Sequence, residues 1–356
     1  MERATILRCG IRAVLWRTRG DERESRSRVR TLVTGGAGYI GSVIVEELQR
    51  AGHTPIVYDS FVKGHRAALP AGVAVVEGDI RDTALLTRTL AEQRIEAVIH
   101  MVGLIEVGLS ASDPAAFFET NVGGSMSVVR AMIEAGSEMD VKRLVFSSSA
   151  AVYADDAPLP LREDAPTGPS SAYGASKLMV EQLLGWVAPV HGLICTSLRY
   201  FNAAGATERN GEAHEPETHL MPLVLRAAER DEGVSLFGTD YPTVDGTCVR
   251  DYVHVRDLAS AHLLALGLSE PGVQTYNVGS GTGYSVRQVI EMAREVTGRA
   301  LPVIERPRRA GDQYATVATS ERIERELGWR PQYSDLRTLL ATAWAWRQTH
   351  PNGYAE

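Results

Sequence analysis

The chain has 356 residues, of which 44% are hydrophobic and 23% are charged, and its formal net charge is -7. This length allows one large domain or two moderate ones, while the acidic balance argues against a nucleic-acid-binding protein, which needs a basic face. No apolar run is long enough to span a membrane. The three cysteines, Cys9, Cys195 and Cys248, match neither a metal site nor a disulfide framework, so we predict no metal and a cytoplasmic location.

Taken in chain order, residues 1–28 are arginine-rich and carry no fold signal, so we interpret them as a disordered tail or the product of an upstream start codon. Hydrophobic periodicity then predicts alternating strands and helices through about residue 198. The strands are expected at 29–34, 54–58, 73–76, 97–100, 143–147 and 193–198, and the helices at 39–51, 83–93, 114–135 and 171–187.

This alternation predicts an α/β fold, a Rossmann-type doubly wound parallel sheet with helices on both faces. Proline, glycine and polar residues dominate from 203 to 222, where the alternation becomes irregular. We therefore predict a first domain over 29–202 and a smaller α/β domain over 203–356, whose elements can be interleaved with the first.

A glycine pattern lies between the first predicted strand and the first predicted helix. Gly35, Gly38 and Gly41 are spaced three apart, with Tyr39 and Ile40 between the last two. Such glycines allow a tight turn, a close approach of the backbone to a pyrophosphate, and close packing of helix on sheet. The strand–loop–helix frame makes this a prediction of a dinucleotide site.

Asp59 ends the second predicted strand. A carboxylate there accepts hydrogen bonds from both ribose hydroxyls and repels a 2′-phosphate, so it favours NAD over NADP. A second glycine cluster, Gly279, Gly281 and Gly283, lies in the irregular half before a predicted helix at 285–297. We interpret this cluster as a structural turn, because the frame of a dinucleotide unit is incomplete there.

Tyr173 and Lys177 are four residues apart on a predicted helix and therefore share one face. A lysine ammonium and a nicotinium ring favour the phenolate form of a tyrosine, which then serves as the base that takes a hydroxyl proton during hydride transfer. Ser149 follows a predicted strand and is well placed to hydrogen-bond the reacting hydroxyl. Ser147 and Ser148 are interpreted as parts of a local turn.

Five stretches resemble the extended short-chain dehydrogenase/reductase family, and its UDP-glucose 4-epimerases most closely: Val33–Ser42, Phe146–Tyr153, Tyr173–Leu178, Arg199–Gly205 and Tyr241–His254. The resemblance runs from about residue 29 to the C-terminus. It implies an NAD-dependent isomerase that interconverts UDP-glucose and UDP-galactose through a 4-keto sugar. Residues 29–202 would bind NAD and residues 203–356 the nucleotide sugar.

The resemblance also implies roles for individual residues. Asp79 and Ile80 would lie along the adenine, Asn121 would support the active-site backbone, and Phe201 would lie near the nicotinamide. The uridine diphosphate would be held by Asn202, His219, Leu220, Phe237, Arg250, Tyr252, Arg309 and Asp312. Arg250 and Arg309 have the guanidinium geometry that suits a diphosphate. A homodimer through the helices at 114–135 and 171–187 is likewise implied by the resemblance.

Several positions depart from the epimerase pattern, namely Val102, Ile105, Leu109 and His219. Thr316 lies near the position where a bulky residue excludes N-acetylated sugars, so UDP-N-acetylglucosamine and a sugar of a specialised pathway stay open as substrates. A dehydratase or a UDP-glucuronate decarboxylase is disfavoured because Ala150 and Ala151, not an acid, follow Ser149. A non-enzymatic NAD sensor is disfavoured by the intact tyrosine and lysine.

Overall fold

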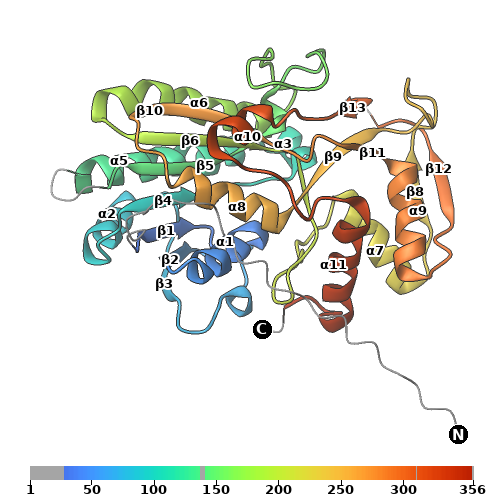
Figure 1. The fold of residues 1–356 in the computed structure, drawn as a ribbon, viewed down its shortest axis with the longest axis horizontal. Coiled ribbons are helices and arrows are strands. Elements are labelled where there is room, and N and C mark those ends of the chain that lie inside the picture. Colours follow the sequence, from blue (N-terminus) through green and yellow to red (C-terminus); the bar gives the residue numbers. More distant parts are fainter. Residues whose placement is uncertain (1–27, 137–140, 310, 355–356) are drawn as a thin grey trace, which may run out of the picture.

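The computed structural model describes residues 28–136, 141–309 and 311–354 (Figure 1). The predicted N-terminal tail, except Arg28, lies outside the described residues, as does Cys9. Within the described residues, none of the helices is long and apolar enough to cross a membrane.

A seven-stranded parallel sheet forms the larger layer and confirms the predicted fold class. Its order is β10-β6-β5-β4-β1-β2-β3. The strands are β1 (Arg30–Thr34), β2 (Thr54–Asp59), β3 (Ala74–Glu77), β4 (Ala97–His100), β5 (Arg143–Ser149), β6 (Ile194–Tyr200) and β10 (Gly272–Val278). Most are short apolar runs buried on both faces, as parallel strands covered by helices must be.

Helices cover both faces of this sheet. The helices α1 (Tyr39–Arg50) and α8 (Val255–Ala265) pack on one face. The opposite face is covered by α2 (Thr83–Glu92), α5 (Gly124–Gly136) and α6 (Ala172–His191). Each face has its own apolar core, so the sheet is held rigidly between two layers.

The single helix predicted over 114–135 is interrupted in the structure. It consists of α4 (Pro114–Phe117), a π-helical turn η2 (Phe118–Gly123) and α5, and α3 (Val107–Ser112) precedes it. Such π-turns are rare and occur often at functional sites. This one contains Asn121, whose hydrogen bonds are described below.

The smaller part lies beside the sheet and has its own apolar core. Its helices are α7 (Leu220–Arg230), α9 (Val286–Thr297) and α11 (Leu336–Thr349). Its strands are β7 (Asn202–Ala204), β8 (Val234–Phe237), β9 (Val249–His254), β11 (Gly283–Ser285), β12 (Val303–Arg306) and β13 (Ala315–Thr316).

The chain beyond residue 203 contributes to both parts. After β9 it returns to the large sheet as α8 and β10, and α10 (Glu321–Leu327) packs beside β10. The domain boundary predicted at residue 203 stays a prediction. The structure does show why the site draws on two distant halves of the sequence.

Candidate active site

A cavity of about 670 Å³ opens at the carboxyl ends of the parallel strands, between the two parts of the molecule. Strands β1, β2, β4, β5 and β6 all end at it. Most of the predicted site residues line this cavity: Gly35, Gly38, Tyr39, Ile40, Gly41, Asp59, Asp79, Ile80, Ser149, Tyr173, Lys177, Phe201, Asn202, His219, Arg250, Asp312 and Thr316.

Four predicted nucleotide-sugar residues lie outside the cavity lining. Leu220 and Tyr252 pack in the core of the smaller part, where Tyr252 is 4% exposed. Phe237 and Arg309 contact each other instead, with the guanidinium 3.9 Å from the ring centroid. Their assignment to the uridine diphosphate stays a prediction.

The glycine turn has the geometry of a dinucleotide cradle. Gly35 adopts a left-handed backbone conformation with φ of 71°, and a Cβ on Gly41 would lie 2.1 Å from the Gly35 carbonyl oxygen. Helix α1 begins directly after this turn, and no side chain caps its N-terminus, which faces the cavity. Uncapped amides at a helix N-terminus suit an anion, so these residues fit a pyrophosphate.

Asp59 is held at the end of β2 with its carboxylate facing the cavity. It is 6% exposed and accepts hydrogen bonds from the amides of Ala37 and Phe61, both at 2.9 Å. Each carboxylate oxygen keeps a further lone pair for a ribose hydroxyl. The residues therefore fit NAD at this end of the cavity.

The three predicted catalytic side chains meet at the ends of β5 and α6. Ser149 is the last residue of β5 and hydrogen-bonds the Tyr173 phenol. Burial raises the pKa of Tyr173 above its ordinary value, and the Ser149 hydrogen bond opposes that rise. The Lys177 ammonium lies 6.0 Å from the Tyr173 ring centroid. Its predicted effect on the pKa of Tyr173 stays a prediction.

Lys177 instead donates to the Ser147 carbonyl at 2.7 Å. Burial lowers the pKa of Lys177 to about 8. Its ammonium is thus fixed to the strand that carries Ser149, in position for a ribose or a phenolate that shares the cavity.

Asn121, on the π-helical turn, does not line the cavity but braces its floor. Its side chain accepts from the Leu104 amide at 2.8 Å and donates to the Ser176 hydroxyl at 2.9 Å. Ser176 in turn donates to the carbonyl of Tyr173 at 2.7 Å. Asn121 therefore ties the segment after β4 to the helix that carries Tyr173.

The interpretation of Ser147 and Ser148 as a turn is wrong, because both belong to β5. Ser148 donates to the buried carboxylate of Glu181 at 2.5 Å, and Arg199 pairs with the same carboxylate at 2.7 Å. The hydroxyl is needed there because a buried ion pair must have its remaining lone pairs satisfied. This network lies beneath Ser149 and fixes the strand end.

The second glycine cluster is confirmed as a structural turn. The amides of Ser280 and Gly281 donate to the carboxylate of Asp251 at 2.7 and 3.0 Å, so the turn wraps a protein carboxylate and not a phosphate. Asp251 also accepts from the Ala318 amide at 3.1 Å. It thereby fixes β9, which presents Arg250 to the cavity.

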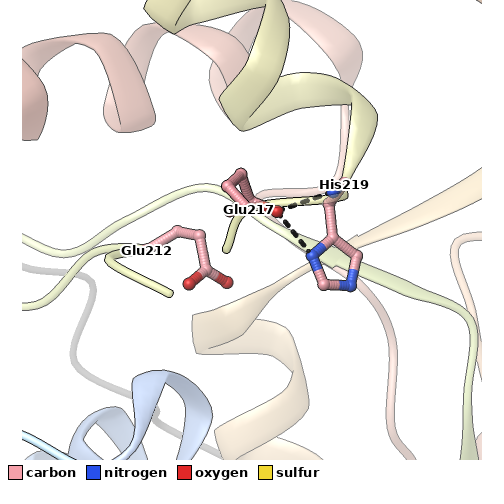
Figure 2. Close-up of side chains that lie close together, drawn as sticks. All are labelled: Glu212, Glu217 and His219. Carbon is pink, nitrogen blue, oxygen red and sulfur yellow. Dashed lines mark hydrogen bonds and ion pairs between the residues drawn. The ribbon is translucent and has the colours of Figure 1, made fainter. Parts of the chain in front are cut away.

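Four residues between β7 and α7 form two His–carboxylate pairs that the sequence analysis only partly anticipates. His214 pairs with Glu212. His219 pairs with Glu217 through Nδ1 at 2.9 Å (Figure 2). Glu212, His214 and His219 line the cavity. Only His219 is predicted from the sequence; the alternation of acids and histidines from 212 to 219 is the signal that could find the others.

The carboxylates of these pairs favour the charged form of both histidines at the edge of the cavity. The hydrogen bond with Glu217 raises the pKa of His219. Burial is the largest single influence on His214 and lowers its pKa, but the hydrogen bond with Glu212 and the negative charges of Glu212, Glu217 and Glu106 together raise the pKa above its ordinary value. One ligand atom each from Glu212, Glu217 and His219 lies within 4.8 Å of the others. The Glu217 carboxylate and the His219 Nδ1 atom are already bonded to each other, so we interpret the cluster as paired ions (Figure 2).

Known proteins share this fold and this arrangement of motifs. The family model described as NAD dependent epimerase/dehydratase family matches residues 31–279. The chain is 46% identical to the UDP-glucose 4-epimerase of Corynebacterium glutamicum, over 89% of this chain and 95% of that relative.

Two solved structures extend this likeness to ligand complexes. A UDP-glucose 4-epimerase from Brucella ovis in complex with NAD has 40% identity and a TM-score of 0.85, over 92% of this chain and 99% of that one. A UDP-glucose 4-epimerase from Bifidobacterium longum in complex with NAD+ and UDP has 36% identity and a TM-score of 0.86, over 92% and 100%.

Proposed function

This chain belongs to the NAD-dependent epimerase/dehydratase family, and we propose that it interconverts UDP-glucose and UDP-galactose by epimerisation at carbon 4. The observation that carries the proposal is the meeting of Ser149, Tyr173 and Lys177 in a cavity that also contains Asp59 and Arg250. One cavity thus combines a base for a sugar hydroxyl, a dinucleotide carboxylate and a cation for a phosphate.

Bound NAD would be held by the first part of the molecule. The glycine turn and the N-terminus of α1 receive the pyrophosphate, and Asp59 receives the adenosine ribose. Asp79, Ile80 and Lys177 line the cavity; Asp79 and Ile80 would lie along the adenine, and Lys177 would lie at the nicotinamide ribose. The chemistry that bound NAD supplies is acceptance and return of a hydride at carbon 4.

Tyr173 is the proton acceptor in this proposal. Its phenolate would take the proton of the 4-hydroxyl as the hydride leaves carbon 4 for bound NAD, which gives a 4-keto sugar and a neutral Tyr173 phenol. Ser149 hydrogen-bonds the same phenol and holds the sugar oxygen beside it. The Lys177 ammonium stabilises the phenolate once a ligand has excluded water from the cavity. Tyr173 then returns the proton when the other face of the keto sugar is reduced.

The second part of the molecule would hold the nucleotide so that the sugar can turn. Arg250 offers a guanidinium fork to the diphosphate, and the adjoining histidines, His214 and His219, add cationic hydrogen-bond donors. Asn202 lines the same wall, with its amide held by the Asp251 carbonyl at 2.8 Å. Asp312 would receive the uridine ribose.

A second candidate substrate is the N-acetylated pair of UDP-hexoses. Thr316 lines the cavity and is small, and its hydroxyl donates to Gln313, another lining residue, at 2.9 Å, so no bulky side chain at position 316 would exclude an acetamido group. A dehydratase is not favoured, because Ala150 and Ala151 follow Ser149 and offer no acid for elimination.

A homodimer is the assembly that we propose. Helix α6 exposes an apolar face on which Met179, Trp186 and Val190 are 47%, 82% and 77% exposed. Contiguous exposed apolar patches mark protein–protein interaction sites when they are large, so this face is the candidate interface. Sedimentation of the purified protein tests this, and Trp186→Glu should shift a dimer towards monomer if the face is correctly assigned.

The function is tested by incubating the purified protein with UDP-glucose, UDP-galactose and their N-acetylated counterparts, with and without added NAD+, and separating the products. Interconversion at carbon 4 is the expected result, and the rates rank the substrates. Protein that binds NAD but converts none of the four would overturn the proposal.

A further inference from the structure

The C-terminal residues form an aromatic cluster against the loop that edges the cavity. We define the C-terminal aromatic cluster as Trp346, His350 and Tyr354, and the cavity loop as residues 205–219. Trp346 and His350 are stacked with ring centroids 4.7 Å apart and planes 8° apart, and the Tyr354 ring lies 5.3 Å from Trp346. Trp346 is 3% exposed although it lies near the end of the last helix, α11.

This cluster hydrogen-bonds the backbone of the cavity loop. The Gly211 amide donates to the Tyr354 hydroxyl at 3.1 Å, and the Gly211 carbonyl lies within hydrogen-bond distance of the same hydroxyl at 3.2 Å. The Trp346 indole donates to the Arg209 carbonyl at 3.2 Å. The cavity loop has no helix or strand to pair these backbone groups, and side chains near the C-terminus pair them instead.

The packing of Gly211 against Trp346 leaves no room for a side chain at position 211. A Cβ on Gly211 would lie 2.2 Å from the Trp346 Cδ2 atom, so the loop backbone lies directly on the indole. On the other side, the Tyr354 ring contacts His65 at a centroid distance of 4.9 Å. His65 follows Gly64, which borders the Asp59 carboxylate. The cluster therefore contacts both the cavity loop and the segment beside Asp59.

The loop residue that follows this contact enters the cavity wall. Glu212, directly after Gly211, lines the cavity and pairs with His214, and His219 lies further along the same loop. A displacement of Gly211 would shift this acidic side chain and its paired imidazole together. Tyr354 and Trp346 do not line the cavity themselves.

We infer that the C-terminal aromatic cluster positions the cavity loop for nucleotide-sugar binding, so that Trp346 and Tyr354 set the affinity for the UDP moiety without touching it. This inference rests on the proposed function for the identity of the ligand. Without the cluster, the loop samples arrangements that do not bind, and the apparent affinity falls by the fraction of molecules in the competent arrangement.

The test compares Tyr354→Phe, Tyr354→Ala and Gly211→Ala with Tyr333→Phe as a matched control. Tyr333 is 39% exposed in the same C-terminal region, and its ring packs against His254, outside the C-terminal aromatic cluster. Calorimetry measures the Kd for UDP, and steady-state assays with UDP-galactose measure KM and kcat. The absorbance of the purified protein measures its bound NAD. We expect Kd for UDP and KM to rise roughly three- to tenfold in the two Tyr354 variants and in Gly211→Ala, with kcat and bound NAD within about twofold.

Two outcomes would overturn the inference. One is an unchanged Kd for UDP in all three variants, whatever happens to their melting temperatures, since that result describes a purely structural cluster. The other is a fall in kcat with constant KM. Failure of the proposed function is distinguishable, because a wild-type protein that binds UDP but epimerises nothing still allows the comparison of Kd values.

Discussion

The two walls of the cavity are held in different ways. The dinucleotide wall, residues 35–41 with Asp59, is fixed by backbone geometry at the ends of β1 and β2, where a glycine turn and two amide hydrogen bonds to a carboxylate suffice. The nucleotide-sugar wall comprises the cavity loop with Arg250 and Thr316. It is fixed by side chains from remote segments, including Asp251 and the C-terminal aromatic cluster.

The difference matches what each wall has to do. A dinucleotide that is regenerated in every turnover needs one rigid position, which buried parallel strands provide. A nucleotide sugar has to enter, turn its hexose and leave, so its wall benefits from loops joined by contacts that can be broken individually. Substitutions in the dinucleotide wall should therefore abolish NAD binding or leave it unchanged, whereas substitutions in the nucleotide-sugar wall should change the affinity for the nucleotide sugar by degrees.

The largest effect is expected where the walls meet, at Tyr173. Tyr173→Phe removes the base and keeps the ring, so kcat should fall by about 10²–10⁴-fold while bound NAD and UDP affinity stay constant. Single-turnover assays with UDP-galactose measure this. Near-wild-type turnover would show that Tyr173 is not the base, and Tyr153→Phe, a buried tyrosine whose hydroxyl bonds Asn277, serves as a comparison for stability.

In the dinucleotide wall, the substitution expected to abolish NAD binding is Gly41→Ala. A methyl group there would lie 2.1 Å from the Gly35 carbonyl oxygen, so Gly41→Ala must displace α1 from the turn, at about 1–3 kcal/mol of unfolding free energy. We expect loss of bound NAD with it. Gly108→Ala is the control, because a Cβ there meets nothing within 4 Å. Full NAD occupancy in Gly41→Ala would contradict a backbone-defined wall.

The same difference decides what the sequence predicts. Local periodicity predicts the parallel sheet, so Gly35 and Asp59, which stand at the ends of two successive predicted strands, could be assigned directly. The π-helical turn could not, because Asn121 bonds Leu104 and Ser176, which are 17 and 55 residues away. The Gly211–Tyr354 contact spans 143 residues and leaves no periodic signal.

Errors in the site follow the same rule. Ser147 and Ser148 are interpreted from the sequence as a turn, yet their backbone pairs with Leu198 and Arg199 of β6, about 50 residues further along the chain, and this pairing makes them part of β5. Tyr252 and Leu220 could be assigned to the nucleotide only by resemblance, and that assignment stays a prediction; their side chains pack in the core of the smaller part. Sequence spacing predicts on which face of a helix or strand a residue lies. It does not predict which distant residue will contact that face.

A smaller and graded effect is expected at Thr316 in the nucleotide-sugar wall. Thr316→Tyr fills space beside the sugar, so the rate with UDP-N-acetylglucosamine should fall about tenfold relative to that with UDP-glucose. The backbone of Thr316 pairs with Arg250 in β9, so the change leaves the diphosphate site intact. Thr316→Ser is the control. An unchanged ratio of the two rates would mean that the acetamido group lies elsewhere.

The smallest effect is a pH dependence confined to the nucleotide-sugar wall. His214 and His219 have raised pKa values, so their charge is complete below the ordinary histidine value of 6.5 and is lost as pH rises through the raised values. The pKa of Glu212 is lowered, although its burial opposes ionisation, so its charge is complete above 4.5 and lost on acidification. The Glu212–His214 pair is therefore strongest between these two pH values.

Affinity for UDP should follow the imidazolium charges. The neighbouring charged groups are Glu106, Glu217, Lys63 and Arg250, and without the imidazoliums the carboxylates leave this wall acidic towards a diphosphate. We expect Kd for UDP to rise roughly threefold to tenfold from pH 6 to pH 9, and calorimetry measures it without turnover. The double variant His214→Asn, His219→Asn should flatten this rise while NAD binding, on the other wall, keeps its own pH profile. If the rise persists in the double variant, the titrating group lies outside the two pairs and the walls are electrostatically linked.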